Sequence, residues 1–204
     1  MTQERFDGEI FGIGTTSGVR VVVGSWSRSR FGTFADAMVE AANGHRTLIA
    51  PSQEVADYVS ATYNFDSVVI TPVTVERSAN SLILTSEPLQ LEATIGGRTA
   101  LGRLLRLVPK RIATATWWAT AIDPIARVVV RGVRTRGAAG NNRREWYGAS
   151  DMHALTSVVG SFDGSPLGTL TAIDPPVRFG FASTPPRPSV VSVTSTIEIA
   201  DEAR

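Results

Sequence analysis

The sequence contains no cysteine, and this absence removes several classes of functional site at once. Disulfide bonds, thiol nucleophiles, zinc–thiolate centres and iron–sulfur clusters all require cysteine. Histidine is almost as scarce, because the chain holds only His45 and His153. A metal site would therefore need carboxylates for most of its ligands. We predict no metal site and no cofactor.

An excess of charge of either sign is also absent, since the net charge is +1. A nucleic-acid partner would require a more basic chain, so we expect none. The N-terminal segment lacks an apolar signal core, and the most apolar stretch, residues 113–130, is interrupted by Asp123, Pro124 and Arg127. That stretch cannot comfortably span a bilayer. We expect a cytoplasmic protein with one domain over residues 1–204.

Short alternating segments separated by turn residues predict a chain dominated by strands. Asn43-Gly44, between "FADAMVEAA" and "HRTLIAP", predicts a hairpin with a type I′ turn, and Asp163-Gly164 predicts a turn after "ALTSVVGSF". "PLQLEATI" alternates apolar and polar residues, and "SVVSVTSTIEI" and "VRFGFAS" do so too. "GIGTTSG" precedes a valine-rich segment instead of a helix, so it is better interpreted as a strand connection than as a phosphate loop.

Three segments have helical patterns. "PSQEVADYVSATY" offers Ser52 as N-cap, "TALGRLLRLV" is followed by Pro109, and "TATWWATAIDPIARVV" contains Pro124, which should kink or divide it. The fold class predicted from these elements is α+β and mainly β. We expect a closed or nearly closed antiparallel β-barrel, lipocalin-like or similar, with a helical insertion around residues 99–126.

The stretch "NNRREWYGASDMH", residues 141–153, holds the densest group of chemically active side chains. As a strand it would point Trp146 to one side and Glu145 and Tyr147 to the other. Asp151 and His153 would share a face, so the carboxylate could orient the imidazole. Ser150, Asp151 and His153 lie too close in sequence to form a hydrolytic triad.

Nearby arginines suggest a second set of contacts, because Arg134 and Arg136 would share a strand face and could clamp an anion. An ordinary solvated strand face explains the same pattern. We take Trp146, Tyr147, His153, Arg134 and Arg136 as candidate ligand-binding residues. The leading prediction is non-catalytic binding of a small, partly apolar molecule, with an anionic group as an option, in the barrel cavity.

The single lysine, Lys110, supports an enzymatic alternative. In a desolvated pocket beside another cation, its pKa would fall and its amine could form a Schiff base. "PKR" resembles the Pro-Lys-Lys nucleophile segment of the acetoacetate decarboxylases, which are also β-rich barrels, but the second lysine is absent here. Lys110 and His153, as a general base, are the candidate catalytic residues. Lys110 could equally be a surface residue at a helix end.

A third interpretation is peripheral membrane association through residues 101–118, where leucines alternate with basic residues and Trp117 and Trp118 follow. A helix that packs its leucines on the sheet is the plainer explanation. The sequence is also compatible with a homodimer.

Most of the chain resembles a family of proteins from high-GC bacteria to which no activity has been assigned. The resemblance rests on "GVRTRGAAGNNRREWYGASDMH" and "FGTFADAMVEAANGHRTLIAPSQEVADYVSATYNFDSVV". It implies a cytoplasmic, single-domain protein and assigns no functional residues.

Overall fold

The computed structural model describes residues 2–129, 133–139, 143–180 and 183–199, and most of these residues are in β-strands. The described strands are β1 (Thr2–Thr15), β2 (Arg20–Arg28), β3 (Phe34–Glu40), β4 (Arg46–Ala50), β5 (Ser67–Ile70), β6 (Thr74–Arg77), β7 (Ser81–Thr85), β8 (Leu89–Arg98), β9 (Arg136–Ala139), β10 (Arg143–Phe162), β11 (Ser165–Pro166), β12 (Leu170–Thr171) and β13 (Ser189–Ile199). The described helices are α1 (Gln53–Ser60), α2 (Ala100–Leu105), α3 (Lys110–Ala113) and α4 (Thr116–Val129).

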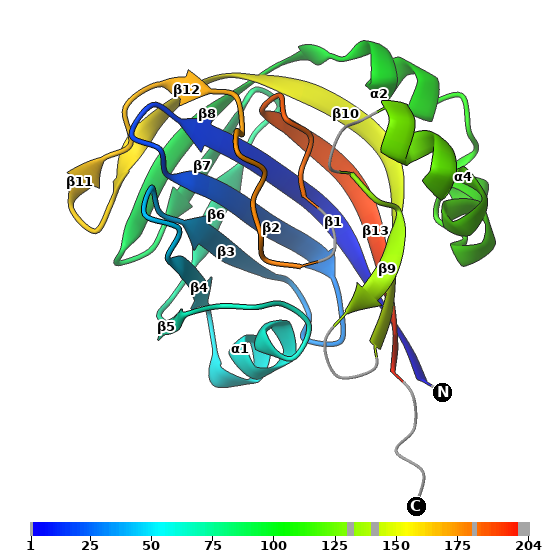
Figure 1. Ribbon diagram of the computed structural model, residues 1–204, viewed down its shortest axis with the longest axis horizontal. Helices are drawn as coiled ribbons and strands as arrows, with labels where there is room; N and C mark the ends of the chain where they lie inside the picture. The colour runs from blue at the N-terminus through cyan, green and yellow to red at the C-terminus, as the bar shows by residue number, and fades with distance from the viewer. Residues whose placement is uncertain (1, 130–132, 140–142, 181–182, 200–204) are drawn as a thin grey trace, which may run out of the picture.

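All of these strands belong to one strongly curved sheet (Figure 1). Its main order is β5-β4-β3-β2-β1-β13-β10-β8-β7-β6, and the β4–β5 pair, which α1 connects, is parallel. Within the described ranges no ladder joins β5 to β6, the two ends of this order. The prediction of a mainly β, α+β fold is confirmed, but the closed barrel is not: the two end strands are only four residues long and each pairs on one side.

The curvature brings β7 and β8 over β1 to β4, and the largest core lies between them. Its fully buried side chains include Phe11, Ile13, Leu82 and Leu84. In β8 the residues from Leu89 to Ile95 alternate between buried and exposed, as the sequence pattern predicted. Because side chains alternate along a strand, every second residue of β1 to β3 points to the opposite face of the sheet. That face must be covered by other parts of the chain.

That second face is covered by α1 and by an irregular segment, residues 173–180. Ser52 caps α1, as predicted, by accepting a hydrogen bond from the Val55 amide. The predicted strand "VRFGFAS" is wrong, although Val177 and Phe179 both face the core; Phe181 lies outside the described residues.

A buried carboxylate explains why this segment is not a strand. Glu40 is completely buried and accepts a hydrogen bond of 2.8 Å from the Arg178 amide, which is therefore not used in a ladder. The Arg178 and Arg20 guanidinium groups also pair with Glu40, at 3.2 and 3.1 Å. Arg20 in turn donates to the Pro175 carbonyl at 2.8 Å. These contacts hold residues 173–180 against the sheet.

The two predicted turns are both present, with one difference in type. Asp163 and Gly164 have positive φ angles of 47° and 72°, as a type I′ turn requires. In the β3–β4 hairpin, Gly44 has a φ of 87° and its amide donates to the Ala41 carbonyl at 2.9 Å. The φ angle of Asn43, however, is not positive. The hairpin is thus confirmed, but it has a type I turn followed by a left-handed glycine, not the predicted type I′ turn.

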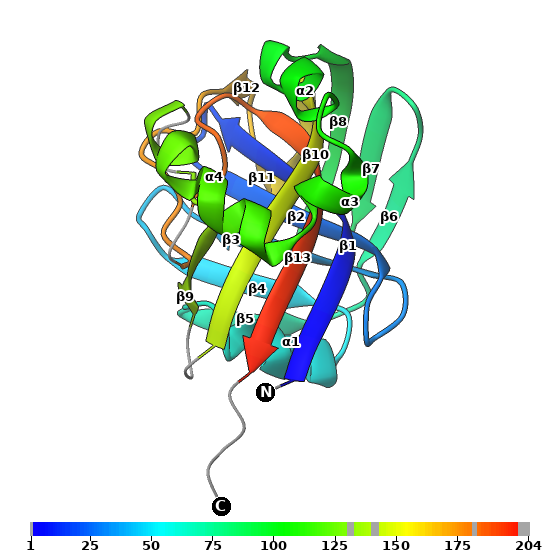
Figure 2. The same cartoon turned by 90° about the vertical axis from the view of Figure 1, so that its right-hand side faces the viewer.

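The predicted helical insertion is confirmed as α2, α3 and α4, which lie along β10 (Figure 2). Helix α4 continues through Pro124, so of the two predicted effects, a kink or a division, the division is wrong; α2 ends at Leu105, before Pro109. On the edge away from β13, β10 pairs with β9 over Arg143–Trp146 and with β8 from His153 onward. Between these ladders, the Tyr147 amide donates to the Thr135 carbonyl at 2.8 Å and the Thr99 amide, just before α2, donates to the Met152 carbonyl at 3.0 Å. Gly148 lies against Ala113 at the end of α3.

Candidate functional site

A cavity of about 490 Å³ lies against the second face of the sheet. Pockets that bind small molecules commonly have this size and an apolar lining. Strands β1, β2, β3, β10 and β13 contribute to its walls, together with the helices α1, α2, α3 and α4 and the segment around residues 177–185. The lining is mainly apolar and includes Ile10, Val22, Met38, Leu101, Leu105, Trp118, Ile122, Met152, Val191 and Val193.

One wall of the cavity carries a buried carboxyl group with several hydroxyl donors. Glu145 is 1% exposed, and the Tyr63 hydroxyl lies 2.9 Å from both of its oxygens. The Ser195 hydroxyl donates to Glu145 at 2.7 Å, and the hydroxyls of Tyr63 and Tyr147 are 2.5 Å apart. Burial raises the pKa of Glu145, and the hydrogen bonds from Ser195, Tyr63 and Tyr147 offset part of that rise. The carboxyl group therefore accepts a proton more readily than an exposed glutamate.

Arg143 lies close enough to influence this carboxyl group electrostatically, and its charge also favours the ionised form of Glu145. Its guanidinium donates to the Tyr58 carbonyl at 3.0 Å and to the Thr62 hydroxyl at 2.8 Å. It also lies 4.6 Å from the centre of the Tyr58 ring. Arg143 thus ties the C-terminal end of α1 to β10.

Asp36 supplies a second carboxyl group to the cavity lining. It is 2% exposed and accepts a hydrogen bond of 2.9 Å from the Trp26 indole. Burial raises the pKa of Asp36 to about 7, and the Trp26 hydrogen bond acts in the opposite direction. Its charge also raises the pKa of Tyr147, so the two carboxyl groups belong to one electrostatic neighbourhood.

Three hydroxyl groups form a separate polar region of the lining. Those of Ser183, Thr184 and Ser189 are buried and have no hydrogen-bond partner within the described ranges. Ser189 and Ser195 are both on the cavity face of β13, and six residues of strand span about 20 Å. Val191 and Val193 lie between them. The cavity wall along β13 therefore has an apolar stretch between two serines, and Ile197 continues it beyond Ser195.

Of the predicted binding residues, two contribute to this cavity. Tyr147 belongs to the Glu145 cluster, and the exposed Arg134 stands at the cavity rim. The strand alternation predicted for residues 144–147 is confirmed, because Glu145 and Tyr147 face the cavity. Trp146 points the other way and its indole donates to Thr120 of α4 at 3.1 Å.

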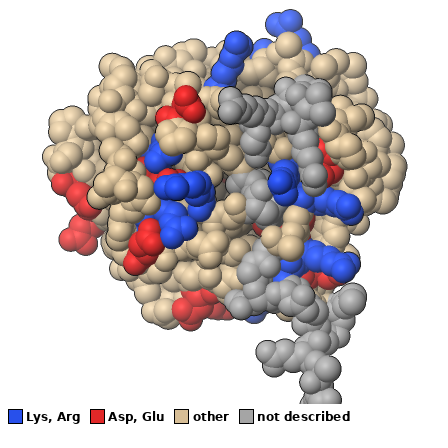
Figure 3. Space-filling model, viewed as in Figure 1, with Lys and Arg blue, Asp and Glu red and all other residues tan. Residues whose placement is uncertain are grey.

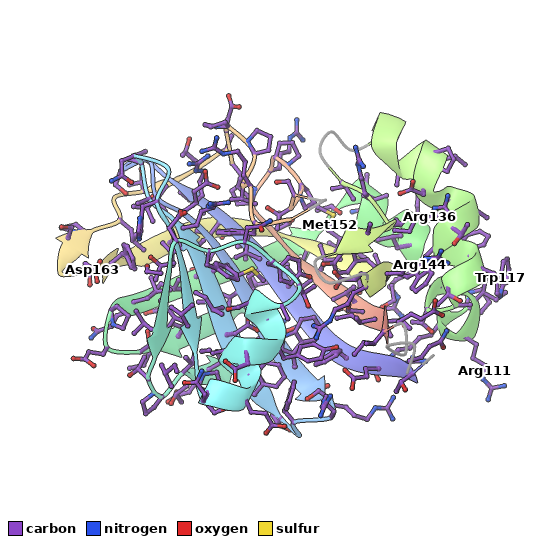
Figure 4. All side chains as sticks on the ribbon, turned by 60° about the horizontal axis from the view of Figure 1, so that its bottom comes forward. Arg111, Trp117, Arg136, Arg144, Met152 and Asp163 are labelled. Atoms are coloured by element: carbon purple, nitrogen blue, oxygen red, sulfur yellow. The ribbon has the colours of Figure 1, made fainter. Side chains whose placement is uncertain are left out.

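The remaining predicted residues lie elsewhere. Arg136 is exposed and, in Figure 4, lies beside α4. His153 is near Asp151, as predicted, with 3.7 Å between Nε2 and the carboxylate, and its Nδ1 is 3.2 Å from the Gly96 carbonyl. Arg98 binds the same Asp151 carboxylate at 2.8 Å. Neither His153 nor Arg136 is among the described residues that line the cavity.

Lys110 begins α3 and is exposed. It borders a separate hollow whose lining includes Asp7, Glu9 and Ser192. The side chains of these residues alternate along their strands with residues that line the cavity, so they point to the opposite side of the sheet, although Trp26 and Val193 border both hollows. Lys110 is therefore not in the desolvated pocket that Schiff-base chemistry requires.

Sequence reasoning missed Asp36, Tyr63 and Ser195, and it treated Glu145 only as part of a strand pattern. A usable signal was present for two of them. Asp36 alternates with Phe34 and Met38 along β3, and Ser195 follows Val191 and Val193 at the same spacing along β13. A polar residue on the apolar face of a strand must be buried with a partner or next to a cavity. Tyr63 follows α1 and carried no such signal.

The chain matches no protein-family model and no curated protein sequence, so the resemblance to the family from high-GC bacteria stays a prediction. Among solved structures, it is similar to a crystal structure of acetoacetate decarboxylase from Legionella pneumophila subsp. pneumophila, with 8% identity and a TM-score of 0.44 over 98% of this chain and 85% of that one. A second acetoacetate decarboxylase structure gives 10% identity and a TM-score of 0.41 over 98% of this chain and 90% of that one. Both likenesses are too weak to assign a fold or an activity.

Two further classes of site are not found in the part of the chain that the structure describes. No described helix is both long enough and apolar enough to cross a bilayer. No group of three or more histidine, aspartate or glutamate side chains is placed to hold a metal ion, again among the described residues.

Proposed function

We propose that this protein binds a small, elongated and mainly apolar molecule in its cavity, with the polar end of that molecule at the Glu145 cluster. The observation that carries the proposal is a cavity of about 490 Å³ in which an apolar lining surrounds buried, hydrogen-bonded carboxyl groups. Apolar walls supply the affinity in such sites, and a few polar groups fix the orientation. The span of about 20 Å between Ser189 and Ser195 suits an extended molecule.

The charges around the cavity favour a neutral or cationic polar end. Both Asp36 and Glu145 are acidic and buried, while the guanidinium of Arg143 already binds Tyr58 and Thr62 and Arg134 is exposed at the cavity rim. An anionic group beside two carboxyl groups would meet like charge in a medium of low dielectric constant. The anionic option considered from the sequence is therefore not part of this proposal; an amine or a hydroxyl that donates hydrogen bonds fits the cluster better.

Binding without catalysis remains the favoured function. A Schiff base requires Lys110, since the chain has no other lysine, and Lys110 is exposed on the opposite side of the sheet. General-base chemistry by His153 would require that residue in the cavity, where the described lining does not include it. The hydrogen-bonded carboxyl groups are placed to orient a ligand.

Three ligands with the same alkyl chain test this proposal: dodecylamine, dodecanol and dodecanoate. Isothermal titration calorimetry should show binding of the amine and the alcohol, with the amine on the order of tenfold tighter than the carboxylate. Binding of none of the three would contradict the proposal. Tighter binding of dodecanoate would retain an apolar cavity but contradict the role given to Glu145 and Asp36.

A further inference from the structure

The helices along β10 and the turns between them expose large apolar side chains to solvent. Leu107 is 78% exposed, Leu104 62%, Trp117 61% and Ile125 60%. Scattered exposed apolar residues are normal on a protein surface, but several within one short helical region point to a surface that another phase or molecule covers. We call this region, formed by α2, α3, α4 and the turns that join them, the helical rim.

The helical rim is also strongly basic. Residues 100–118 include Arg103, Arg106, Lys110 and Arg111, all exposed, and contain no aspartate or glutamate. On the face shown in Figure 3, basic and acidic side chains lie close together near the middle of the molecule, in keeping with a net charge of +1. Figure 4 shows Trp117 and Arg111 pointing outward from this side of the molecule. Apolar and cationic groups are therefore presented together.

The helical rim is continuous with the cavity. Leu104 on α2 and Ile125 on α4 are exposed to solvent and also line the cavity. Both helices pack against β10. A surface that contacts Leu104 and Ile125 would therefore lie at the cavity opening.

We propose that the helical rim docks on a membrane surface that contains anionic lipid, with Leu107 and Trp117 inserted at the level of the headgroups. Tryptophan favours this interfacial region, and exposed leucines add apolar area. The basic side chains are attracted to anionic headgroups. Docking itself does not depend on the ligand. Entry of the ligand into the cavity directly from the bilayer is a further step, and it rests on the function proposed above.

A second copy of this chain fits the same surface less well. A two-fold dimer through the helical rim would bring the four basic side chains of one copy against those of the other. Like charges across an interface oppose association. An anionic membrane can accept the apolar side chains at its interface and attract the basic side chains through its headgroups.

Co-sedimentation of the full chain with phosphatidylcholine vesicles, with and without phosphatidylserine, tests the docking. The partition coefficient should rise with the phosphatidylserine content and fall at high salt. The double variant Leu107→Ser/Trp117→Ser should lower it by about tenfold or more. Neither residue is part of the described cavity lining, so binding of dodecylamine in solution, measured separately, should be unchanged.

A matched control removes exposed apolar area elsewhere. Val159 and Ile83 are 71% and 37% exposed and both pair with Glu92, from the strands on either side of it. The variant Val159→Ser/Ile83→Ser should bind vesicles like the wild type. For charge, Arg111→Gln should weaken binding about fivefold, whereas Arg187→Gln, an exposed arginine outside the helical rim, should not.

Each result decides the proposal. Loss of vesicle binding in the variants of the helical rim, with both controls intact, supports it. A wild-type protein that is folded but does not bind phosphatidylserine vesicles overturns it. A concentration-dependent dimer that Leu107→Ser/Trp117→Ser dissociates, observed by analytical ultracentrifugation, overturns it in favour of self-association.

Discussion

The hydroxyl of Tyr63 lies 2.9 Å from both carboxyl oxygens of Glu145, although the two residues are 82 positions apart in the chain. Tyr63 follows α1, which covers one face of the sheet, and Glu145 belongs to β10. The contact therefore requires the curved sheet and its helical cover to be assembled together. It gives the mainly apolar cavity a fixed polar group.

The substitution Glu145→Gln tests what that polar end recognises. The amide keeps the shape of the side chain but removes its capacity for negative charge. We expect affinity for dodecylamine to fall about tenfold and affinity for dodecanol to change by less than about threefold. Fluorescent probe displacement measures both. Glu92→Gln, at an exposed glutamate of β8, is the control and should alter neither; an equal loss of both ligands in Glu145→Gln would assign the residue a structural role.

The raised pKa of Asp36 predicts a specific dependence of stability on pH. Burial holds this pKa at about 7 in the folded protein, above the ordinary value of 3.8. The folded state therefore binds this proton more tightly than the unfolded state does. The resulting stabilisation of the fold is fully present below about pH 4 and is lost as the pH rises through about 7. Asp36→Asn cannot ionise and can still accept the Trp26 hydrogen bond through its amide oxygen.

Urea unfolding at a series of pH values between about 4 and 8 measures this difference. The free energy of unfolding of Asp36→Asn, relative to wild type, should increase across that range by a few kcal/mol, because one pKa unit corresponds to about 1.4 kcal/mol. Parallel curves for the two proteins would mean that Asp36 is ionised at little cost and is not desolvated.

The position of Lys110 predicts that no imine forms. Incubation with a β-keto acid and borohydride should leave the intact mass of the protein unchanged. Lys110→Ala should bind dodecylamine like the wild type and change the free energy of unfolding by no more than about 0.5 kcal/mol, as is usual for an exposed residue. A reduced adduct in the wild type that is absent from Lys110→Ala would restore the Schiff-base alternative.

The attachment of α2 to β10 depends on a glycine. A Cβ atom at Gly102 would lie 2.2 Å from the Met152 carbonyl oxygen, which is a backbone atom and cannot easily move. Gly102→Ala should therefore destabilise the protein by about 1–3 kcal/mol, even though alanine favours helix formation. Gly97→Ala is the control, because nothing lies within 4 Å of its added Cβ. Similar melting temperatures for the two variants would show that α2 is loosely attached.

Much of the fold was predictable because local patterns determine it. The alternation in residues 89–95, the Ser52 cap and the Asp163-Gly164 turn depend on neighbouring residues, and all three predictions are confirmed. The predicted strand at 177–183 failed because its conformation depends on Glu40, which lies far away in sequence and binds the Arg178 amide. The sheet curvature and its two free ends also arise from long-range pairing.

The site was predictable only in part for the same reason. The alternation along β10 correctly predicted that Tyr147 and Trp146 point to opposite faces of the strand, but it could not predict which face lines a cavity. The arginines and His153 drew attention because charged and titratable groups are conspicuous in a sequence. In the structure, buried polar side chains of the cavity come instead from Asp36, Glu145 and Ser195. Each is a single polar residue on an otherwise apolar strand face.

The most direct test of the central claim is to titrate the neutral apolar probe N-phenyl-1-naphthylamine into wild-type protein and into Val191→Phe, which places a larger side chain in the cavity lining. Val159→Phe, at an exposed position of β10, is the control. We predict saturable, stoichiometric fluorescence enhancement in the wild type and the control, and a loss of affinity of at least about tenfold in Val191→Phe. Equal binding by all three proteins would show that the probe binds outside the cavity and would contradict the proposed function.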